Sequence, residues 1–72
     1  MVKNKFGKFV RRKRLEKGFT LNKFAIAADI DPAIISRIEN GMQDTKLSIL
    51  MKIAKFFNLS ASEFLAEFEK SP

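Results

Sequence analysis

Hydrophobic residues recur three and four positions apart along most of the chain, which is the spacing of an amphipathic α-helix. Five stretches carry this pattern, and short polar segments or glycines separate them. No stretch alternates hydrophobic and polar residues as a half-buried strand does. The pattern predicts an all-α, compact five-helix domain that occupies residues 1–72, with an ordered core at about residues 5–69. The expected helices cover Lys5–Lys17, residues 21–28, residues 32–39, Lys46–Phe57 and Ala61–Glu69.

The same spacing identifies the face of each helix that should be buried. The residues on these faces are Phe6, Phe9, Val10, Leu21, Phe24, Ala25, Ala28, Ile35, Ile38, Leu47, Leu50, Ala54, Phe57, Phe64, Leu65 and Phe68.

The fourth expected helix carries a second hydrophobic stripe beside its core face, formed by Ile49, Ile53 and Phe56. A wide stripe in so small a protein indicates either a deeply embedded helix or a surface for a partner. We favour the second interpretation. Ile49, Ile53, Phe56 and Phe68 are therefore predicted to form a homodimer interface.

Residues 20–41 have the features of a helix-turn-helix. Thr20 and Asp31 are residue types that cap helix N-termini, and Pro32 suits the first position of a helix. Gly41 suits the residue that follows a helix. Two short helices joined by a tight turn leave the outer face of the second one free, and in DNA-binding proteins that face enters the major groove. The second helix is therefore predicted to be a recognition helix.

Two local signals mark the start of the last expected helix. Asn58 suits a left-handed position that ends the preceding helix. Ser60 and Glu63 have the spacing of a capping box, in which each side chain bonds the other residue's backbone N–H.

The net charge of +6 is distributed unevenly along the chain. Residues 1–23 hold nine Lys or Arg and one acid, whereas residues 24–72 hold five Lys or Arg and seven acids. A basic half suits a polyanion such as nucleic acid or a membrane surface, but it is equally typical of a solvated helix face. The first expected helix has only a short hydrophobic stripe, which core packing explains better than membrane binding.

The residue types that are missing narrow the possible functions. The chain has no Cys and no His, which excludes disulfides, thiol catalysis, histidine acid–base chemistry and the usual zinc sites. Neither a Gly-rich phosphate loop nor a constellation of catalytic residues is present, so we expect no enzyme, no metal and no cofactor. No hydrophobic run approaches the ~18–20 residues that span a bilayer, and no signal peptide is visible. A cytoplasmic protein with no membrane partner and no small-molecule ligand is expected.

Several short motifs occur in one order along the chain. They are the R-x-x-x-G-x-T segment from Arg14 to Thr20, Phe24-Ala25, Ile30-Asp31, Ile35-Ser36-Arg37-Ile38-Glu39, Gly41, Leu50 to Ala54 and Leu59-Ser60. In this order and spacing the chain resembles the lambda-repressor-like helix-turn-helix family, the Cro and phage-repressor (XRE) type, over about residues 6–68. The resemblance implies a compact bundle that binds operator DNA as a symmetric dimer.

A docked recognition helix presents its outward residues to base edges and its flanks to phosphates. Arg37 is the best candidate for base reading, because a guanidinium can pair both acceptors of guanine, while the apolar residues suit thymine methyl groups. The predicted base-reading residues are Pro32, Ala33, Ile34, Ser36 and Arg37. The predicted phosphate contacts are Thr20, Leu21 (through its backbone N–H), Asn22, Asn40, Gln43 and Lys46.

The resemblance also implies an internal ion pair between Arg14 and Glu39, which would tie the first helix to the recognition helix. Two residues depart from the family pattern. Leu21 stands where the family often has Gln, and Asp29 stands where Gly is usual in the turn, so some backbone strain is expected at Asp29.

The expected function is sequence-specific binding of double-stranded DNA by a homodimeric transcriptional regulator, most often a repressor that occludes a pseudo-palindromic operator. The alternative is a protein-interaction module that kept the fold and lost base reading. The apolar run Pro32-Ala33-Ile34 motivates this alternative. Arg37, Lys46 and the basic first half of the chain favour DNA binding.

Overall fold

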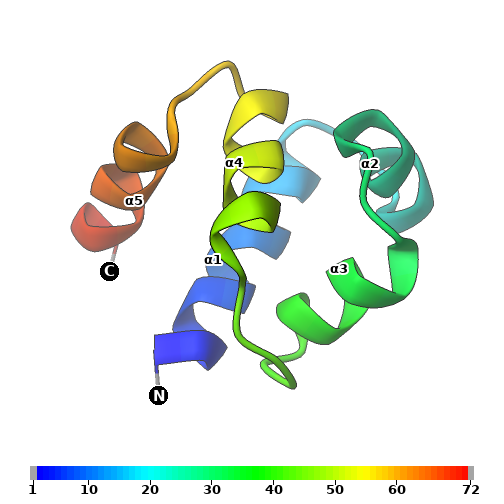
Figure 1. Ribbon diagram of the computed structural model, residues 1–72, viewed down its shortest axis with the longest axis horizontal. Coiled ribbons are helices and arrows are strands. Elements are labelled where there is room, and N and C mark those ends of the chain that lie inside the picture. The colour runs from blue at the N-terminus through cyan, green and yellow to red at the C-terminus, as the bar shows by residue number, and fades with distance from the viewer. Residues whose placement is uncertain (1, 72) are drawn as a thin grey trace.

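A computed structural model describes residues 2–71 of the chain, and within this range the regular secondary structure is entirely helical. The five helices pack into a bundle of nearly equal extent in all directions, 27 × 25 × 23 Å (Figure 1). None of them is long and hydrophobic enough to cross a membrane. The helices are α1 (Val2–Glu16), α2 (Leu21–Ala28), α3 (Pro32–Glu39), α4 (Leu47–Phe56) and α5 (Ala61–Lys70).

The all-α prediction is confirmed, and the observed boundaries follow the signals in the sequence. The largest difference is at α1, which begins at Val2 and not at Lys5. Asn58 has a left-handed backbone (φ 60°), as expected of the residue after α4. The capping box of α5 is complete, since Ser60 Oγ accepts from the backbone N–H of Glu63 at 3.1 Å and Glu63 Oε1 accepts from that of Ser60 at 2.8 Å. The backbone N–H and the hydroxyl of Ser60 lower the pKa of Glu63.

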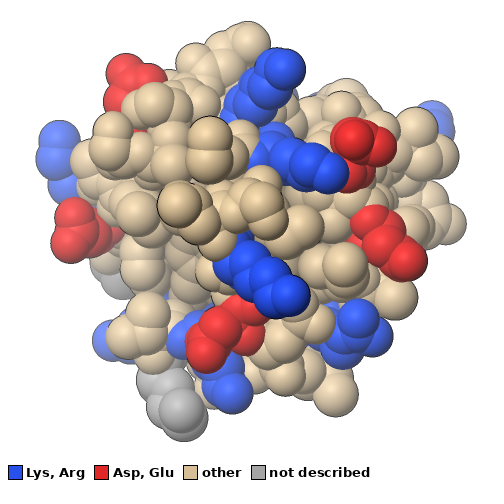
Figure 2. All heavy atoms as spheres, viewed as in Figure 1, with Lys and Arg blue, Asp and Glu red and all other residues tan. Residues whose placement is uncertain are grey.

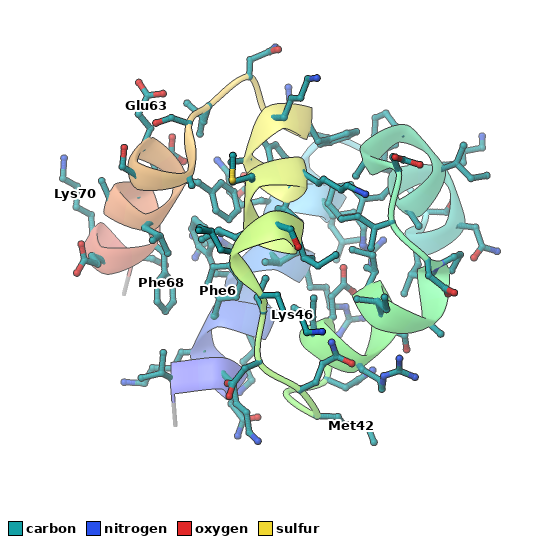
Figure 3. The ribbon with its side chains drawn as sticks, in the orientation of Figure 1. Phe6, Met42, Lys46, Glu63, Phe68 and Lys70 are labelled. Carbon is teal, nitrogen blue, oxygen red and sulfur yellow. The ribbon has the colours of Figure 1, made fainter. Side chains whose placement is uncertain are left out.

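Phenylalanine rings fill much of the core and join the helices that lie far apart in the sequence. Phe64 of α5 is fully buried and contacts the rings of Phe6 and Phe9 on α1 and of Phe57 after α4. Phe68 adds an edge contact to Phe6, with ring centroids 5.3 Å apart, and the two labelled side chains are neighbours in Figure 3. These contacts fasten α5 to α1 and α4.

The sequence prediction of the α4 packing is correct at Leu50, Ala54 and Phe57 but differs from the structure at Leu47 and at the second stripe. Ile53 is fully buried, and Ile49 and Phe56 pack against the core, so the second stripe is embedded and not free for a partner. Leu47, expected in the core, has 68% of its surface exposed. Because both stripes of α4 have helical spacing, only the positions of its neighbours decide which residues of the two stripes are buried.

Two further residues differ from the expected core and interface. Leu65 was expected in the core but is exposed on α5. Phe68, expected at a dimer interface, is half-buried and packs against the core. The predicted homodimer interface is therefore wrong at Ile53, which cannot reach a partner, while Ile49, Phe56 and Phe68 are half-buried and pack against the core.

Candidate nucleic-acid interface

Helices α2 and α3 form a helix-turn-helix whose ends are held by local hydrogen bonds. Thr20 Oγ1 accepts from the backbone N–H of Lys23 at 3.2 Å and caps α2. Asp31 Oδ1 accepts from the N–H of Ala33 at 2.8 Å and caps α3, with Pro32 in the first helical turn. Both predicted caps are confirmed, and the first turn of α3 is fixed by its own sequence.

The turn between α2 and α3 is built around Asp29, whose backbone is left-handed (φ 59°). The N–H of Asp29 donates to Ile26 O at 3.1 Å, and the N–H of Ile30 donates to Ala25 O at 2.9 Å. This pattern is the Schellman motif that usually contains glycine. Asp29 therefore takes the conformation that glycine would have there.

Lys52 of α4 reinforces this turn, a contact that spacing in the sequence could not have suggested. Its Nζ lies 2.9 Å from the backbone oxygen of Asp29 and 3.5 Å from the carboxylate Oδ2. The charge of Lys52 faces a turn carbonyl that has no helical partner.

The inner face of α3 is fixed in the core, and its outer face is open. Ile35 and Ile38 are fully buried. Among the predicted base-reading residues, Pro32, Ala33 and Arg37 are exposed and Ser36 is half-buried. Ile34 is half-buried and packs against the core, so only part of its side chain faces outward.

Arg14 and Glu39 form a buried ion pair between α1 and the last turn of α3. Arg14 Nε and Nη2 lie 2.8 and 3.0 Å from the two carboxylate oxygens of Glu39. Arg14 Nη1 donates to the backbone oxygen of Phe19 at 2.7 Å. The hydrogen bond to Glu39 is the main cause of the raised pKa of Arg14, and it outweighs the opposing effect of burial. The guanidinium thus links three segments of the chain.

The close approach of α1 to α3 depends on Gly7, which is not among the residues predicted from the sequence to be important. A Cβ atom at this position would overlap the backbone oxygen of Ile38 and lie 3.0 Å from that of Glu39. Only hydrogen fits between α1 and the end of α3. The sequence does contain one sign of this close approach: a glycine lies on the hydrophobic face of a segment whose other residues favour a helix.

The predicted phosphate contacts lie at the start of α2 and beyond the end of α3. The side chains of Thr20, Asn22, Asn40 and Lys46 are exposed. Leu21 packs against the core and offers DNA only its backbone N–H, one of the unpaired donors of the first helical turn. Lys46 lies at the start of α4, after the loop that carries Met42 (Figure 3).

Two side chains beyond the end of α3 bond to α3 itself. Asn40 Nδ2 donates to the backbone oxygen of Ser36 at 2.8 Å. Gln43 Oε1 accepts from Nε of Arg37 at 2.7 Å. The strongest base-reading candidate and one of the phosphate candidates are therefore in direct contact.

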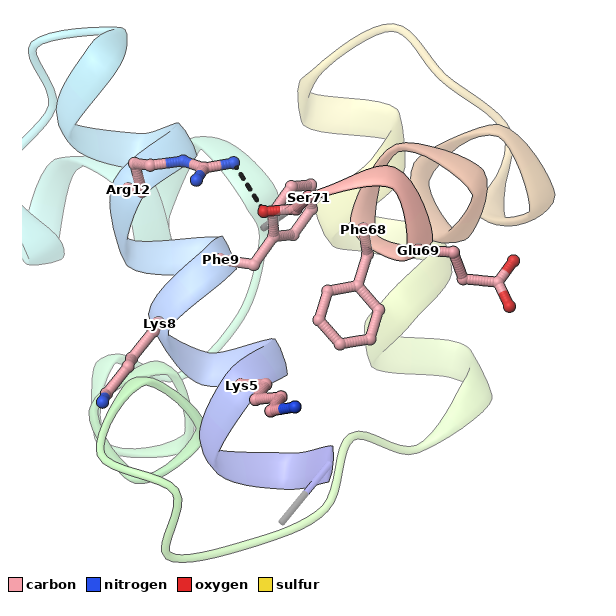
Figure 4. A pocket seen from close by; sticks show the side chains of 7 residues that line it. All are labelled: Lys5, Lys8, Phe9, Arg12, Phe68, Glu69 and Ser71. Atoms are coloured by element: carbon pink, nitrogen blue, oxygen red, sulfur yellow. Dashed lines mark hydrogen bonds between the residues drawn. The ribbon is translucent and has the colours of Figure 1, made fainter.

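The basic residues of α1 are spread around the helix and are not concentrated beside α3. Lys13 pairs with Glu67 at 3.0 Å, and Arg12 donates to Ser71 Oγ at 3.1 Å. Lys5, Lys8 and Arg12 line an open hollow of about 400 Å³ between α1 and the end of α5 (Figure 4). Much of the charge of α1 thus contributes to the overall positive potential of the molecule. It does not lie beside the outer face of α3.

A surface poor in charge lies on a different side of the molecule, over α4 and the start of α5. Leu47 and Met51 are exposed there and line a shallow hollow together with Leu59 and Ala61. Lys52 and Lys55 border this hollow. In Figure 2, Lys and Arg side chains follow α4, and a broad area without charged side chains lies between them and α5.

Comparison with known proteins gives consistent matches. Residues 10–64 match the model of a helix-turn-helix family, HTH_3. The chain is 33% identical over 70 residues to control protein C.MunI of a Mycoplasma species, and the alignment covers 96% of this chain and 95% of that protein.

Two solved structures share the fold. The clp gene regulator ClgR from Corynebacterium glutamicum superposes with a TM-score of 0.81 at 25% identity, over 99% of this chain and 91% of the other. An HTH_3-family transcriptional regulator from Vibrio cholerae superposes with a TM-score of 0.79 at 26% identity, over 90% of this chain and 36% of the other.

Proposed function

Because this chain belongs to the XRE-type helix-turn-helix family of DNA-binding transcriptional regulators, we propose that it binds a pseudo-palindromic operator as a homodimer and represses by occlusion. The proposal rests on the difference between the two faces of α3. Its ends and its buried inner face are held by the rest of the protein, while Ala33 and Arg37 are exposed on the outer face. A rigid helix with an open outer face suits the major groove, where base edges are read. The cytoplasm is the expected location of such a regulator.

Base reading is assigned to the outer face of α3. The Arg37 guanidinium pairs O6 and N7 of a guanine, and Ser36 bonds a base or a phosphate. Pro32, Ala33 and the exposed part of Ile34 have no side-chain donors, but they can pack on thymine methyl groups. The half-site is therefore expected to contain thymines beside a guanine.

Phosphate binding is assigned to the flanking residues. The first turn of α2, with Thr20, the Leu21 N–H and Asn22, presents donors and the positive end of a helix dipole to one phosphate. Asn40, Gln43 and Lys46 bind the backbone beyond the other end of α3. These contacts fix the position of the helix and do not read sequence.

Dimerisation is assigned to the surface over α4 and α5 that contains Leu47, Met51, Leu59 and Ala61. Two exposed hydrophobic residues, Leu47 and Met51, lie one helical turn apart on the outer side of α4 and support a second copy of the chain as the occupant. A two-fold axis there would place two α3 helices on half-sites about one DNA turn, ~34 Å, apart. The similarity to a control protein over nearly its whole length supports a regulatory role.

The decisive test is selection of bound sites from a random duplex pool with purified protein at moderate salt. We expect enrichment of two related half-sites with dyad symmetry, and loss of one base preference with Arg37→Ala. Retention of DNA without enrichment, vanishing as salt rises, would mean backbone electrostatics alone. In that case the apolar outer face of α3 is better explained as a docking surface for another protein.

A further inference from the structure

We propose that Gln43 is a positioning residue for base reading, because it holds the Arg37 guanidinium so that only the two terminal nitrogens, Nη1 and Nη2, face DNA. The inference rests on the proposed function, since it concerns how Arg37 reads a base. Beside the phosphate contact assigned above, which its amide N–H groups can still make, Gln43 gains a role in how guanine is recognised through its Oε1.

The contact between the two side chains is a short hydrogen bond at the protein surface. Nε of Arg37 lies 2.7 Å from Oε1 of Gln43. Within residues 2–71, no carboxylate lies within ion-pair distance of Arg37. The carboxamide of Gln43 is therefore the group that orients this guanidinium before DNA arrives.

The backbone that follows α3 places Gln43 beside Arg37, because the residue before Gln43 is hydrogen-bonded to the backbone oxygen of Arg37. The N–H of Met42 donates to the backbone oxygen of Arg37 at 2.8 Å, and the N–H of Gly41 donates to Ile38 O at 3.0 Å. Gly41 has the left-handed backbone (φ 70°) that such a helix end requires. A Cβ at Gly41 would overlap the side chain of Asn4, so α1 lies directly against this turn.

This arrangement decides which donors of Arg37 remain for a base. A guanidinium has one N–H at Nε and four at its two terminal nitrogens. With Nε bonded to Gln43, guanine O6 and N7 are met end-on by Nη1 and Nη2. The orientation exists before binding, so less side-chain freedom is lost when the base is bound. The Gln43 amide N–H groups stay available for a phosphate.

The first experiment tests the contact in the protein without DNA, by NMR of the Arg37 Nε–H group. Arg37→Lys identifies the signal by removing it. We expect slower exchange of this proton with water in the wild type than in Gln43→Leu, which keeps similar bulk and lacks the acceptor. Equal exchange rates in the two proteins would overturn the proposal.

The second experiment measures affinity for the duplex most enriched by the wild type and for the same duplex with the Arg37-dependent guanine replaced. We expect Gln43→Leu to reduce the discrimination between the two by about threefold to tenfold, the effect of one side-chain hydrogen bond. In the Arg37→Ala background, Gln43→Leu should cause no further loss of discrimination. Gln43→Glu keeps the acceptor and should retain the discrimination, while it lowers affinity for both duplexes because it adds a negative charge.

Two other outcomes have distinct meanings. If Gln43→Leu weakens both duplexes equally with discrimination unchanged, and does so in the Arg37→Ala background as well, Gln43 is a phosphate contact only and the proposal is overturned. If Arg37→Ala changes no base preference at any position, the assignment of base reading to Arg37 is wrong, and the role of Gln43 in base reading is excluded with it. The exchange experiment then still reports whether the contact exists.

Discussion

The guanidinium of Arg14 and the carboxylate of Glu39 are almost completely removed from water, with exposed side-chain fractions of 8% and 4%. Each charge is compensated by the other, and the Phe19 carbonyl accepts a further hydrogen bond from Arg14. Loss of one partner leaves the other charge buried and unpaired, which is far more unfavourable than loss of a surface pair. Among single substitutions of polar residues, we therefore expect those at Arg14 or Glu39 to lower the free energy of unfolding the most.

We predict that Glu39→Ala lowers the free energy of unfolding by about 3–5 kcal/mol in urea denaturation. At this chain length the melting temperature should fall by more than about 10 °C. The raised pKa of Arg14 means that its stabilising effect is fully present below the unfolded-state pKa and is lost only as pH rises through the folded-state value. The contribution of Arg14 is therefore constant through neutral pH.

Glu67→Ala is the matched control, because it removes the partner of Lys13 in a more exposed pair. That change should reduce stability by no more than about 1 kcal/mol. Equal effects of the two substitutions would show that the Arg14–Glu39 pair has no special importance for stability.

At the scale of elements, the contact of α1 with the end of α3 positions the recognition helix. A Gly7→Ala substitution would ordinarily favour a helix by about 0.5–1 kcal/mol. Here the added methyl overlaps a backbone oxygen of α3 that cannot rotate away. We predict a net loss of about 1–3 kcal/mol in the free energy of unfolding, as for overpacked cores, together with weaker binding to the selected duplex.

Lys8→Ala, at the adjacent exposed position on α1, is the control and should change stability by less than about 0.5 kcal/mol. Backbone NMR shifts of α3 should move in Gly7→Ala and stay unchanged in Lys8→Ala. A Gly7→Ala protein as stable as the wild type would contradict the close packing of α1 on α3.

Elements whose signals are local could be predicted from the sequence, and orientations that depend on packing could not. The caps at Thr20, Asp31 and Ser60 and the left-handed Asn58 involve neighbours within a few residues, so the sequence contains all that determines them. The rotation of α4 about its axis depends on the helices around it. The two hydrophobic stripes therefore gave no basis for predicting that Ile53 is buried and Leu47 is exposed.

The same distinction applies to the candidate site. The outward positions on α3 follow from its buried residues, and the Arg14–Glu39 pair followed from the family resemblance and not from spacing. The contacts of Gln43 with Arg37 and of Lys52 with Asp29 depend on how loops and helices meet in three dimensions. No periodicity in the sequence encodes such contacts.

At the scale of the whole molecule, the exposed surface over α4 and α5 determines the expected assembly. Leu47 has 68% and Met51 55% of its surface exposed, and both lie on the same side of α4. Burying each side chain contributes about 1.5–3 kcal/mol. A charge placed there would remove this gain and remain desolvated in the dimer.

We predict that Leu47→Glu and Met51→Glu convert a dimer into a monomer in sedimentation equilibrium at micromolar concentration, with little change in the melting temperature of the monomer. Leu15→Glu is the control, since Leu15 is comparably exposed on α1 and outside this surface. A wild type that stays monomeric at high micromolar concentration, or Glu variants that remain dimeric, would exclude this surface as the interface.

The division of α3 into a fixed inner face and an open outer face has a consequence for evolution. Within α3, Ile35, Ile38 and Glu39 contribute to stability, and the groups proposed to meet DNA are carried by exposed positions such as 33 and 37, which contribute little to the core. Substitutions at the outer positions can accumulate without unfolding the protein. After duplication of its gene, one copy could acquire a different operator in a few steps while both copies keep the same scaffold.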